Sequence, residues 1–294
     1  MDIGKIIEKG ESQGTGFWGW AAALFAVLLI RTVFESLLEV WKKPQIFEYF
    51  FFHYFLSWIS IFLSIILILK IFSGEKISKT SRMTIVFYPL IFIVPVIDFV
   101  VSGGRGYNLG YVFGNAQYLL EQAASFFSNF PERGVTIGEK TLIVLAVFFS
   151  GVYSWAKTKK YWKGIAAGAA VYASLLFYAF FFSILGIISY GPEAWEASGY
   201  SLTGELLISG NYLYAGLIIF QLVLWVFFWN RKKFFALAKN LRPSRAVHYA
   251  GIMPLFGVLV FYYLNPFEST SMVNLPALKC GASAVQPLQL DSVA

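Results

Sequence analysis

Charged residues are scarce in this chain. Only 13% of its 294 residues are charged, whereas 58% are hydrophobic and 19% are aromatic. A water-soluble domain has about 25% charged and about 45–50% apolar residues, so it could not cover this much Phe, Ile and Leu. The shortage of charge therefore excludes an ordinary soluble fold. It indicates a chain whose apolar side chains face lipid, with Trp and Tyr suited to the two membrane interfaces.

Cysteine and histidine are nearly absent. The single cysteine, Cys280, excludes a disulfide within the chain. With only two histidines beside it, a zinc site of about four protein ligands is not expected. The sequence also has no HExxH, no P-loop and no Asp-rich DxxxD stretch. These absences argue against a zinc protease and an ATPase, and no cofactor is evident.

Seven apolar stretches approach the ~20 residues that a membrane-spanning helix needs. They are residues 17–40, 46–72, 84–101, 141–155, 165–190, 206–229 and 246–264. The fourth is short and the seventh is weakly apolar. No cleavable signal peptide is evident, so the first stretch is expected to remain as a signal anchor. We predict an all-α, polytopic bundle of about seven transmembrane helices.

The basic residues fall in alternate loops, at 70–82, 157–163 and 231–245, whereas the loop at 190–205 has three glutamates and no Lys or Arg. The net charge of +7 is then explained by loops facing the cytoplasm. With no soluble basic domain present, nucleic acid is not an expected partner. This pattern predicts a multi-pass protein of the cell membrane with its N-terminus inside and its C-terminus outside. Lys42 and Lys43 fall on the outer side and do not fit the rule.

The predicted organisation follows from these spans. Residues 1–16 form a cytoplasmic N-terminus, and 17–229 form a six-helix membrane domain with an external loop at 102–135. Within that loop, YLLEQAASFF is expected to form an amphipathic turn or helix. Residues 230–264 supply a basic cytoplasmic loop and the seventh helix, and 265–294 form a polar, disordered tail.

Ionisable residues within the first predicted helix need a reason to be there, because each costs roughly 2.5–3.5 kcal/mol at membrane depth. Arg31 and Glu35 are four residues apart and share one helix face, which Glu39 extends by a turn. One interpretation is a structural ion pair that orients this helix. The other is a polar site that faces a cavity and contributes to substrate binding.

A second candidate polar site lies at the outer end of the third predicted helix. Asp98 stands just before SGGRG and Arg105, and Asn108, Asn115 and Gln117 follow. These side chains could form a polar pocket that opens outward. The alternative is a helix-end acid that pairs with a loop arginine.

Three other features have mainly structural interpretations. Pro89 and Pro95 break the hydrogen-bond ladder of the third helix. His53, within EYFFFHYF, is expected to pack rather than to bind a metal or act as a base. Gly164 and Gly168 form a GxxxG that indicates helix packing.

One stretch, FALAKNLRPSRAVHYAGIMPLFGVLVFYYL, resembles the first helix of UbiA-like intramembrane prenyltransferases. The resemblance covers about thirty residues. In that family, two Asp-rich motifs on later helices bind magnesium and the prenyl pyrophosphate, and no such motif occurs here. The resemblance therefore implies a membrane domain upstream of a truncated or split prenyltransferase, with magnesium only if such a domain completes it. Arg242 and Arg245, in the matched stretch, are candidate lipid-headgroup ligands.

Three functions remain open on these grounds. The first is a membrane domain that handles lipid or isoprenoid substrates, with membrane lipids and a downstream or separate prenyltransferase domain as partners. The second is a small transporter or channel-like protein that uses the polar face of the first helix. The third is a structural assembly partner. Because the few acids are scattered, we expect no prenyltransferase activity from this chain alone.

Overall fold

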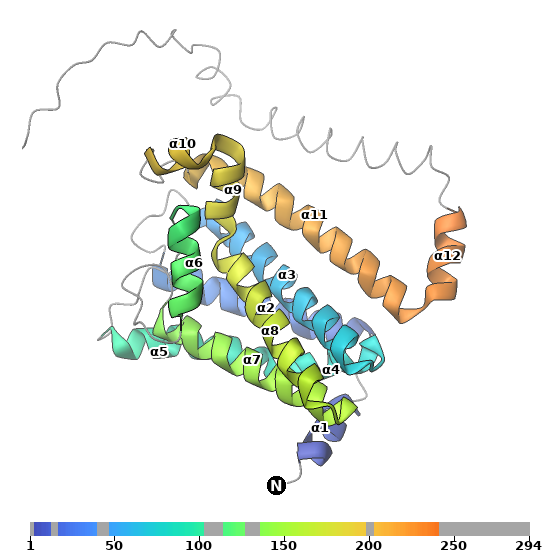
Figure 1. The fold of residues 1–294 in the computed structure, drawn as a ribbon. Coiled ribbons are helices and arrows are strands. Elements are labelled where there is room, and N and C mark those ends of the chain that lie inside the picture. Colours follow the sequence, from blue (N-terminus) through green and yellow to red (C-terminus); the bar gives the residue numbers. More distant parts are fainter. Residues whose placement is uncertain are drawn as a thin grey trace, which may run out of the picture. The chain divides into compact units, whose positions relative to one another are not determined.

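The computed structural model describes residues 3–12, 17–39, 47–102, 114–126, 136–197 and 203–240, and within these ranges it contains helices and turns but no strand (Figure 1). The chain divides into two units, residues 1–231 and 232–294. In the second unit the described residues belong to α12 (Arg231–Asn240). The helices of the first unit are α1 (Ile3–Glu11), α2 (Phe17–Glu39), α3 (Phe47–Ser73), α4 (Ile77–Phe87), η3 (Tyr88–Phe92), α5 (Ile93–Val101), α6 (Ala116–Ser125), α7 (Ile137–Thr158), α8 (Tyr161–Ala179), α9 (Phe181–Tyr190), α10 (Pro192–Ala197) and α11 (Thr203–Trp229).

Four helical stretches are long and apolar enough to cross a membrane. They are His53–Ser73, Ile77–Val101, Ile137–Thr158 and Gly210–Trp229. The pair α8 and α9 bends by 58° and makes a fifth if it counts as one span, while α2 holds a shorter apolar stretch, Trp18–Val33. The all-helical class is therefore confirmed for the described residues, and their long apolar helices are compatible with a membrane protein. The seventh predicted span, 246–264, lies outside the described residues, so the count of seven stays a prediction.

The third span begins earlier than the predicted boundary at Thr84. The polar residues between Ile77 and Thr84 are predicted from the sequence to lie in a loop, but they belong to α4. Thr80 and Ser81 donate their hydroxyl hydrogens to the Ile77 carbonyl at 2.9 and 2.8 Å, so the helix itself satisfies them. The loop before this span therefore shrinks to residues 74–76. At Pro89 the helix tightens into the 3₁₀ turn η3, as expected for a proline that removes a backbone donor.

Helix α7 is longer at both ends than the predicted 141–155. Thr136 and Glu139 form a capping box that starts it, with Thr136 Oγ1 accepting from Glu139 N at 3.1 Å and Glu139 Oε2 accepting from Thr136 N at 3.0 Å. The helix ends at Thr158 and is capped by Lys159, whose φ of 56° is left-handed. The signal T-x-x-E for this start is present in the sequence as TIGE.

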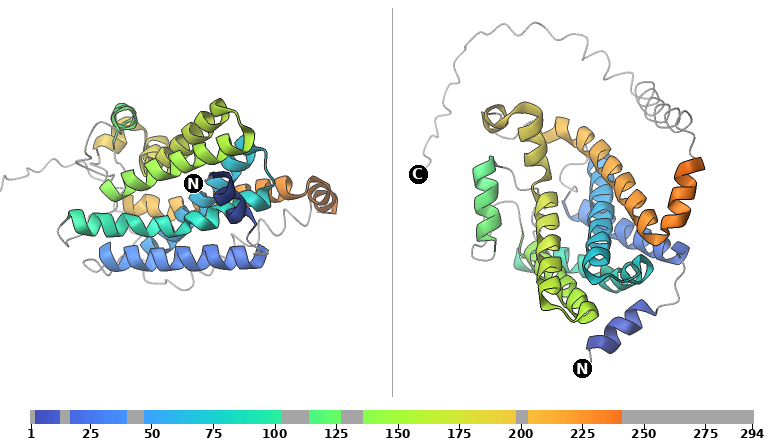
Figure 2. Two further views of the ribbon diagram at one scale, coloured as in Figure 1. Left: turned by 90° about the horizontal axis from the view of Figure 1, so that it is seen from below. Right: turned by 45° about the vertical axis from the view of Figure 1, so that its right-hand side comes forward.

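Helix α3 is the central element of the bundle. It contacts α2, α4, α7, α8 and α11, and Figure 2 shows it running alongside α8 and α11. Its residues Leu63 and Ile66 are buried with Leu28 of α2 and with Tyr88 and Ile91 of η3. The bundle is thus organised around one apolar helix.

Helices α7 and α8 pack closely through glycines. A Cβ added at Gly164 would lie 2.7 Å from the Gly151 carbonyl oxygen, and one at Gly168 would lie 3.3 Å from that of Val147. The Gly164 and Gly168 pair therefore serves the close α7–α8 contact, and Gly151 supplies the opposite surface.

The first predicted segment, 1–16, contains a helix that the sequence interpretation did not anticipate. In α1 the side chain of Ile7 is buried together with Glu11, whereas Lys5 and Lys9 are exposed. Helix α1 contacts α4 and α7, so it packs against the ends of two spans. Nine residues are too few to make a helix stable alone, and its partners account for it.

Candidate functional site

A cavity of about 190 Å³ lies between α3, α4, η3, α7, α8 and α11. Most of its lining is aliphatic or aromatic, with Ile61 and Ile65 on α3, Leu142 and Ala146 on α7, and Leu175 on α8. The space could hold on the order of fifteen water-sized or methylene-sized groups. Along α3 the lining runs from Tyr54 to Leu69, which is roughly 22 Å of helix. The lining of the cavity therefore extends along the axis of α3.

The polar lining of this cavity is sparse. It consists of hydroxyl groups, the indole N–H of Trp58 and one carboxylate, that of Glu139; no lysine, arginine or histidine lines it within the described residues. The hydroxyl-bearing lining residues are Tyr54, Ser57, Thr84, Ser150, Tyr153, Tyr178 and Tyr214. An apolar, narrow space with few polar groups suits an alkyl or isoprenoid chain better than an ion or a sugar.

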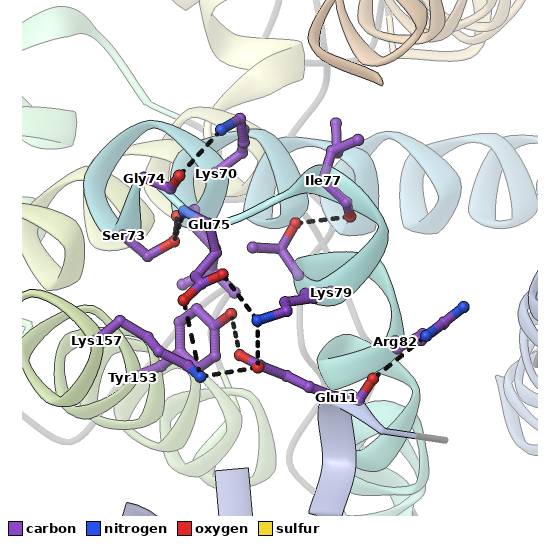
Figure 3. A network of polar contacts seen from close by, with 12 residues as sticks. Glu11, Lys70, Ser73, Gly74, Glu75, Ile77, Lys79, Arg82, Tyr153 and Lys157 are labelled. Atoms are coloured by element: carbon purple, nitrogen blue, oxygen red, sulfur yellow. Dashed lines mark hydrogen bonds and ion pairs between the residues drawn. The ribbon is translucent and has the colours of Figure 1, made fainter. Parts of the chain in front are cut away.

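One end of the cavity adjoins a buried charge cluster, drawn in Figure 3. Glu11 of α1 is buried, and its Oε2 lies 2.7 Å from Lys157 Nζ and 3.5 Å from Lys79 Nζ. Tyr153, which lines the cavity, donates its hydroxyl hydrogen to Glu11 Oε1 at 2.8 Å. Helix α1 is therefore tied to α4 and α7 at this end. We call it the Glu11 end.

The charges in this cluster balance one another. Glu75, in the α3–α4 turn, lies 3.2 Å from Lys79 Nζ and 3.9 Å from Lys157 Nζ. Two carboxylates thus face two ammonium groups. Arg82 also donates to the Glu11 backbone carbonyl at 3.4 Å. Both lysines are engaged by carboxylates, whereas Arg82 is held by a backbone carbonyl.

Apolar contacts also attach α1 to the cavity wall. Ile7 packs with Leu69, Met83 and Tyr153, all three of which line the cavity. A Cβ added at Gly10 would lie 2.7 Å from the Met83 sulfur, so α1 approaches α4 closely. Helix α1 therefore covers the cavity wall at the Glu11 end.

The opposite end, which we call the Asp98 end, is built around the buried carboxylate of that residue on α5. Asp98 Oδ2 accepts from Thr136 Oγ1 at 2.5 Å, and Oδ1 accepts from Gly138 N at 2.9 Å. Asp98 thus stabilises the N-terminus of α7, where backbone N–H groups and the helix dipole favour a negative charge. Arg105 and Asn108 lie outside the described residues, so a pocket shared with them stays a prediction.

The two other polar residues named for that pocket have local roles. Asn115 caps α6 by accepting from Tyr118 N at 2.9 Å. Gln117 is exposed and donates to Glu121 at 2.9 Å along the same helix. Helix α6 contains most of YLLEQAASFF, the stretch expected to be amphipathic.

A hydrogen-bonded network lies in the middle of the bundle, between α3, α8 and α11. Gln221 Nε2 donates to Ser64 Oγ at 2.7 Å and to Tyr178 OH at 3.1 Å, and Ser60 Oγ lies 2.7 Å from Tyr178 OH. Such bonds between spans hold helices together where water is absent. Tyr178 also lines the cavity, so the network fixes one wall of it.

His53 has a packing role, as expected. It is fully buried, its Nδ1 lies 2.8 Å from Asn211 Oδ1, and its ring contacts Phe182 and Tyr214. The described residues include no group of three His, Cys, Asp or Glu side chains that could hold a metal ion.

The first candidate pair lies on α2, and Arg31 contacts the lining residue Trp58 without lining the cavity itself. Arg31 is fully buried, and its guanidinium carbon lies 5.6 Å from the centre of the Trp58 ring on α3, a cation–π distance. The side chain of Glu35 is outside the described residues, as are Arg242 and Arg245. The proposed ion pair and the headgroup site therefore stay predictions.

Sequence reasoning missed the Glu11 cluster and the cavity. Lys157 was counted only as a basic loop residue and Glu11 and Glu75 carried no prediction, because nothing in the sequence brings residues so far apart together. The TIGE capping signal could have located the Asp98 end, since a buried helix start needs acceptors. In comparisons with known proteins, no family model matches the chain, and no curated protein or solved structure matches it.

Proposed function

We propose that this chain is a multi-pass membrane protein that binds a long-chain lipid or isoprenoid in the cavity. The observation that carries the proposal is the elongated apolar lining along α3, from Tyr54 to Leu69. A hydrated ion pathway needs polar groups along its length, and this lining has few, so the transporter or channel alternative has less support. No separate observation favours the purely structural role.

The proposal also includes binding partners and the absence of prenyl transfer by this chain alone. Membrane lipids supply the ligand, and a downstream or separate prenyltransferase domain with its own magnesium is the partner implied by the resemblance. Arg242 and Arg245 would then contact lipid headgroups, and the chain alone would not transfer prenyl groups. Incubating the purified chain with magnesium and prenyl diphosphate, and measuring pyrophosphate release, tests the last point. Magnesium-dependent turnover would contradict it.

The proposed topology has seven spans, the N-terminus inside and the C-terminus outside. It is supported by the contacts of Glu11 with Lys79 and Lys157, which bring α1 and the two basic turns to one end. A single cysteine at Lys159, in a Cys280→Ala background, should resist an impermeant thiol reagent in intact cells and react after permeabilisation. Labelling of intact cells would contradict this topology.

Lipid binding can be tested by filling the cavity. Ala146→Trp places a large side chain in the lining, whereas Val144→Trp places the same side chain on the exposed face of the same helix. We expect the first variant to bind a photoreactive long-chain probe at least about tenfold more weakly, and the second to bind as the unmodified chain does. Equal labelling of both variants, with both folded, would contradict the proposal.

A further inference from the structure

We infer that the Glu11 end closes the cavity and that Met83, supported from behind by α1, sets the longest hydrocarbon chain that the cavity accepts. This inference rests on the proposed function and specifies its ligand by length, for neutral and charged head groups alike. It follows from the burial of the lining at each end and from the contacts between α1 and α4.

The lining is covered differently at the two ends of the cavity. At the Glu11 end, the lining residues Leu69, Met83 and Tyr153 are 3%, 3% and 2% exposed. At the Asp98 end, Glu139 and Leu142 are only partly buried. A hydrocarbon chain in the cavity can therefore extend past Glu139 and Leu142, whereas it ends against the buried residues at the Glu11 end.

The side wall next to the Glu11 end is aromatic. Phe87 of α4 and Phe149 of α7 line the cavity, and their ring centres are 4.8 Å apart. Each ring lies one helical turn from a residue of the closed end, Met83 on α4 and Tyr153 on α7. The two rings join α4 to α7 at this level, so the end of a bound chain has a wall beside it as well as ahead of it.

Met83 occupies the closed end, between the cavity and α1. Its side chain lines the cavity and packs with Leu69, Tyr153 and Ile7. A Cβ added at Gly10 would lie 2.7 Å from the Met83 sulfur and 3.7 Å from its Cε. A methionine side chain is flexible, so by itself it would give way to a longer ligand. With α1 directly behind it, the side chain has little room to withdraw.

Helix α1 is fixed behind Met83 by polar contacts as well as by packing. Glu11 Oε2 lies 2.7 Å from Lys157 Nζ, and Tyr153 donates to Glu11 Oε1 at 2.8 Å. Arg82 of α4 donates to the Glu11 backbone carbonyl at 3.4 Å. These contacts attach the last turn of α1 to α4 and α7, so α1 supports Met83 on the side away from the cavity.

A cavity that is apolar and closed at one end distinguishes ligands by the length of their hydrocarbon chain. Each further methylene group that is buried strengthens binding about fourfold. Affinity should therefore rise with chain length until the ligand reaches Met83. Carbons beyond that point must stay outside the cavity or push side chains out of their rotamers, so they add nothing or weaken binding.

A homologous series of ligands tests this limit. Straight-chain alcohols that increase in length by two carbons compete with a photoreactive long-chain lipid for the purified full-length chain. Met83→Ala removes about three heavy atoms and leaves their space empty at the closed end. In this variant we expect the limiting chain length to increase by about two to four carbons, and the first chain beyond the original limit to bind about tenfold more tightly.

Two further variants show whether the position of the substitution matters. Leu142→Ala, at the Asp98 end, should weaken binding of all chain lengths alike without moving the limit. Val86→Ala, on the exposed face of α4 and outside the lining, should change neither the affinity nor the limit. An unchanged limit in Met83→Ala, or the same shift in Leu142→Ala, would overturn the inference. If no alcohol of the series competes for the unmodified chain, it is the proposed function that fails.

The support from α1 is tested without a change in the lining, which also tests the limit if Met83→Ala does not fold. Ile7→Ala leaves space behind Met83, so this side chain can withdraw and the limit should increase by about two carbons. Ile6→Ala makes the same change at a position of α1 that is 41% exposed, and it should leave the limit unchanged. Equal limits in the two variants would overturn the supporting role of α1.

Discussion

The two ends of the bundle bury a carboxylate in different ways. At the Glu11 end the acid faces two lysines, and the partners are charged side chains on α4 and α7. At the Asp98 end the partners are a hydroxyl and a backbone N–H, both neutral, at the start of α7. One carboxylate is compensated by opposite charge, the other by hydrogen bonds and the helix dipole.

The difference follows from the structural role of each end: one attaches the short helix α1, and the other forms the N-terminus of α7. Helix α1 is a separate short element, and long lysine side chains can reach it from two neighbouring helices. Helix α7 begins at the Asp98 end, where its first N–H groups need acceptors in any case. At the Glu11 end, ion pairs connect different helices, so their contribution to stability depends on salt concentration. At the Asp98 end, the contribution comes from hydrogen bonds to neutral groups and does not depend on salt.

The largest effect is expected at Arg31, which is fully buried on α2. If it pairs with Glu35, Arg31→Met alone leaves a buried charge unpaired and should cost about 3–5 kcal/mol of unfolding free energy. Arg31→Met with Glu35→Gln should cost much less. Unfolding of the two single variants and the double variant in detergent measures this. Equal, negligible losses in all three would show that charge pairing is confined to the Glu11 end.

Asp98→Ala should have the next largest effect. It removes two hydrogen bonds to a charged acceptor and leaves the Gly138 N–H buried without one, at a cost of about 3 kcal/mol. Asp98→Asn retains one acceptor oxygen and should lose about half as much. Both losses should be independent of salt concentration in detergent unfolding experiments. A strong salt dependence would remove the distinction between the two ends.

Close packing at the Asp98 end gives the third prediction. In Gly138→Ala the new Cβ would collide with the Val94 carbonyl oxygen and lie 2.8 Å from Asp98 Oδ2, so α5 and α7 must separate. We expect a loss of about 2 kcal/mol. Gly216→Ala is the matched control on α11, because its Cβ would meet nothing within 4 Å. It should be neutral or slightly stabilising, and an equal loss in both would contradict the packing argument.

The smallest effect is expected for Glu11→Gln, about 1 kcal/mol, because glutamine keeps an acceptor for Tyr153 and Glu75 still faces both lysines. The loss should shrink as salt is raised. A cycle with Lys157→Met should show coupling, since this lysine is only 14% exposed and 2.7 Å away. Additive losses in that cycle would mean that the ion pair does not hold α1 in place.

Apolar length made most spans predictable, but not the interactions between them. The predicted stretches 17–40 and 46–72 agree with α2 and α3 within one residue at each end, because long apolar runs have few alternative structures. The start of α4 was misread because Thr80 and Ser81 are polar in composition yet satisfied within the helix. Composition cannot show where such a hydroxyl is directed.

The site could not be predicted for a different reason. Asp98 and Thr136 are 38 residues apart, and Glu11 and Lys157 are 146 apart, so no local pattern connects them. The cavity likewise arises from how Ile61, Ala146 and Leu175 face one another across three helices. Apolar periodicity identifies such residues as membrane-embedded, but it does not show which of them leave space between them.

The docking of α1 also has a consequence in time. Glu11 leaves the ribosome long before its partners, because Tyr153 and Lys157 follow it by 142 and 146 residues. At about 5–20 residues per second, synthesis of that interval takes roughly 7–30 s. Through this period Ile7 can contact Leu69 and Met83 but not Tyr153. Helix α1 therefore completes its docking late, so that an incompletely covered Ile7 distinguishes an unfinished bundle from a complete one.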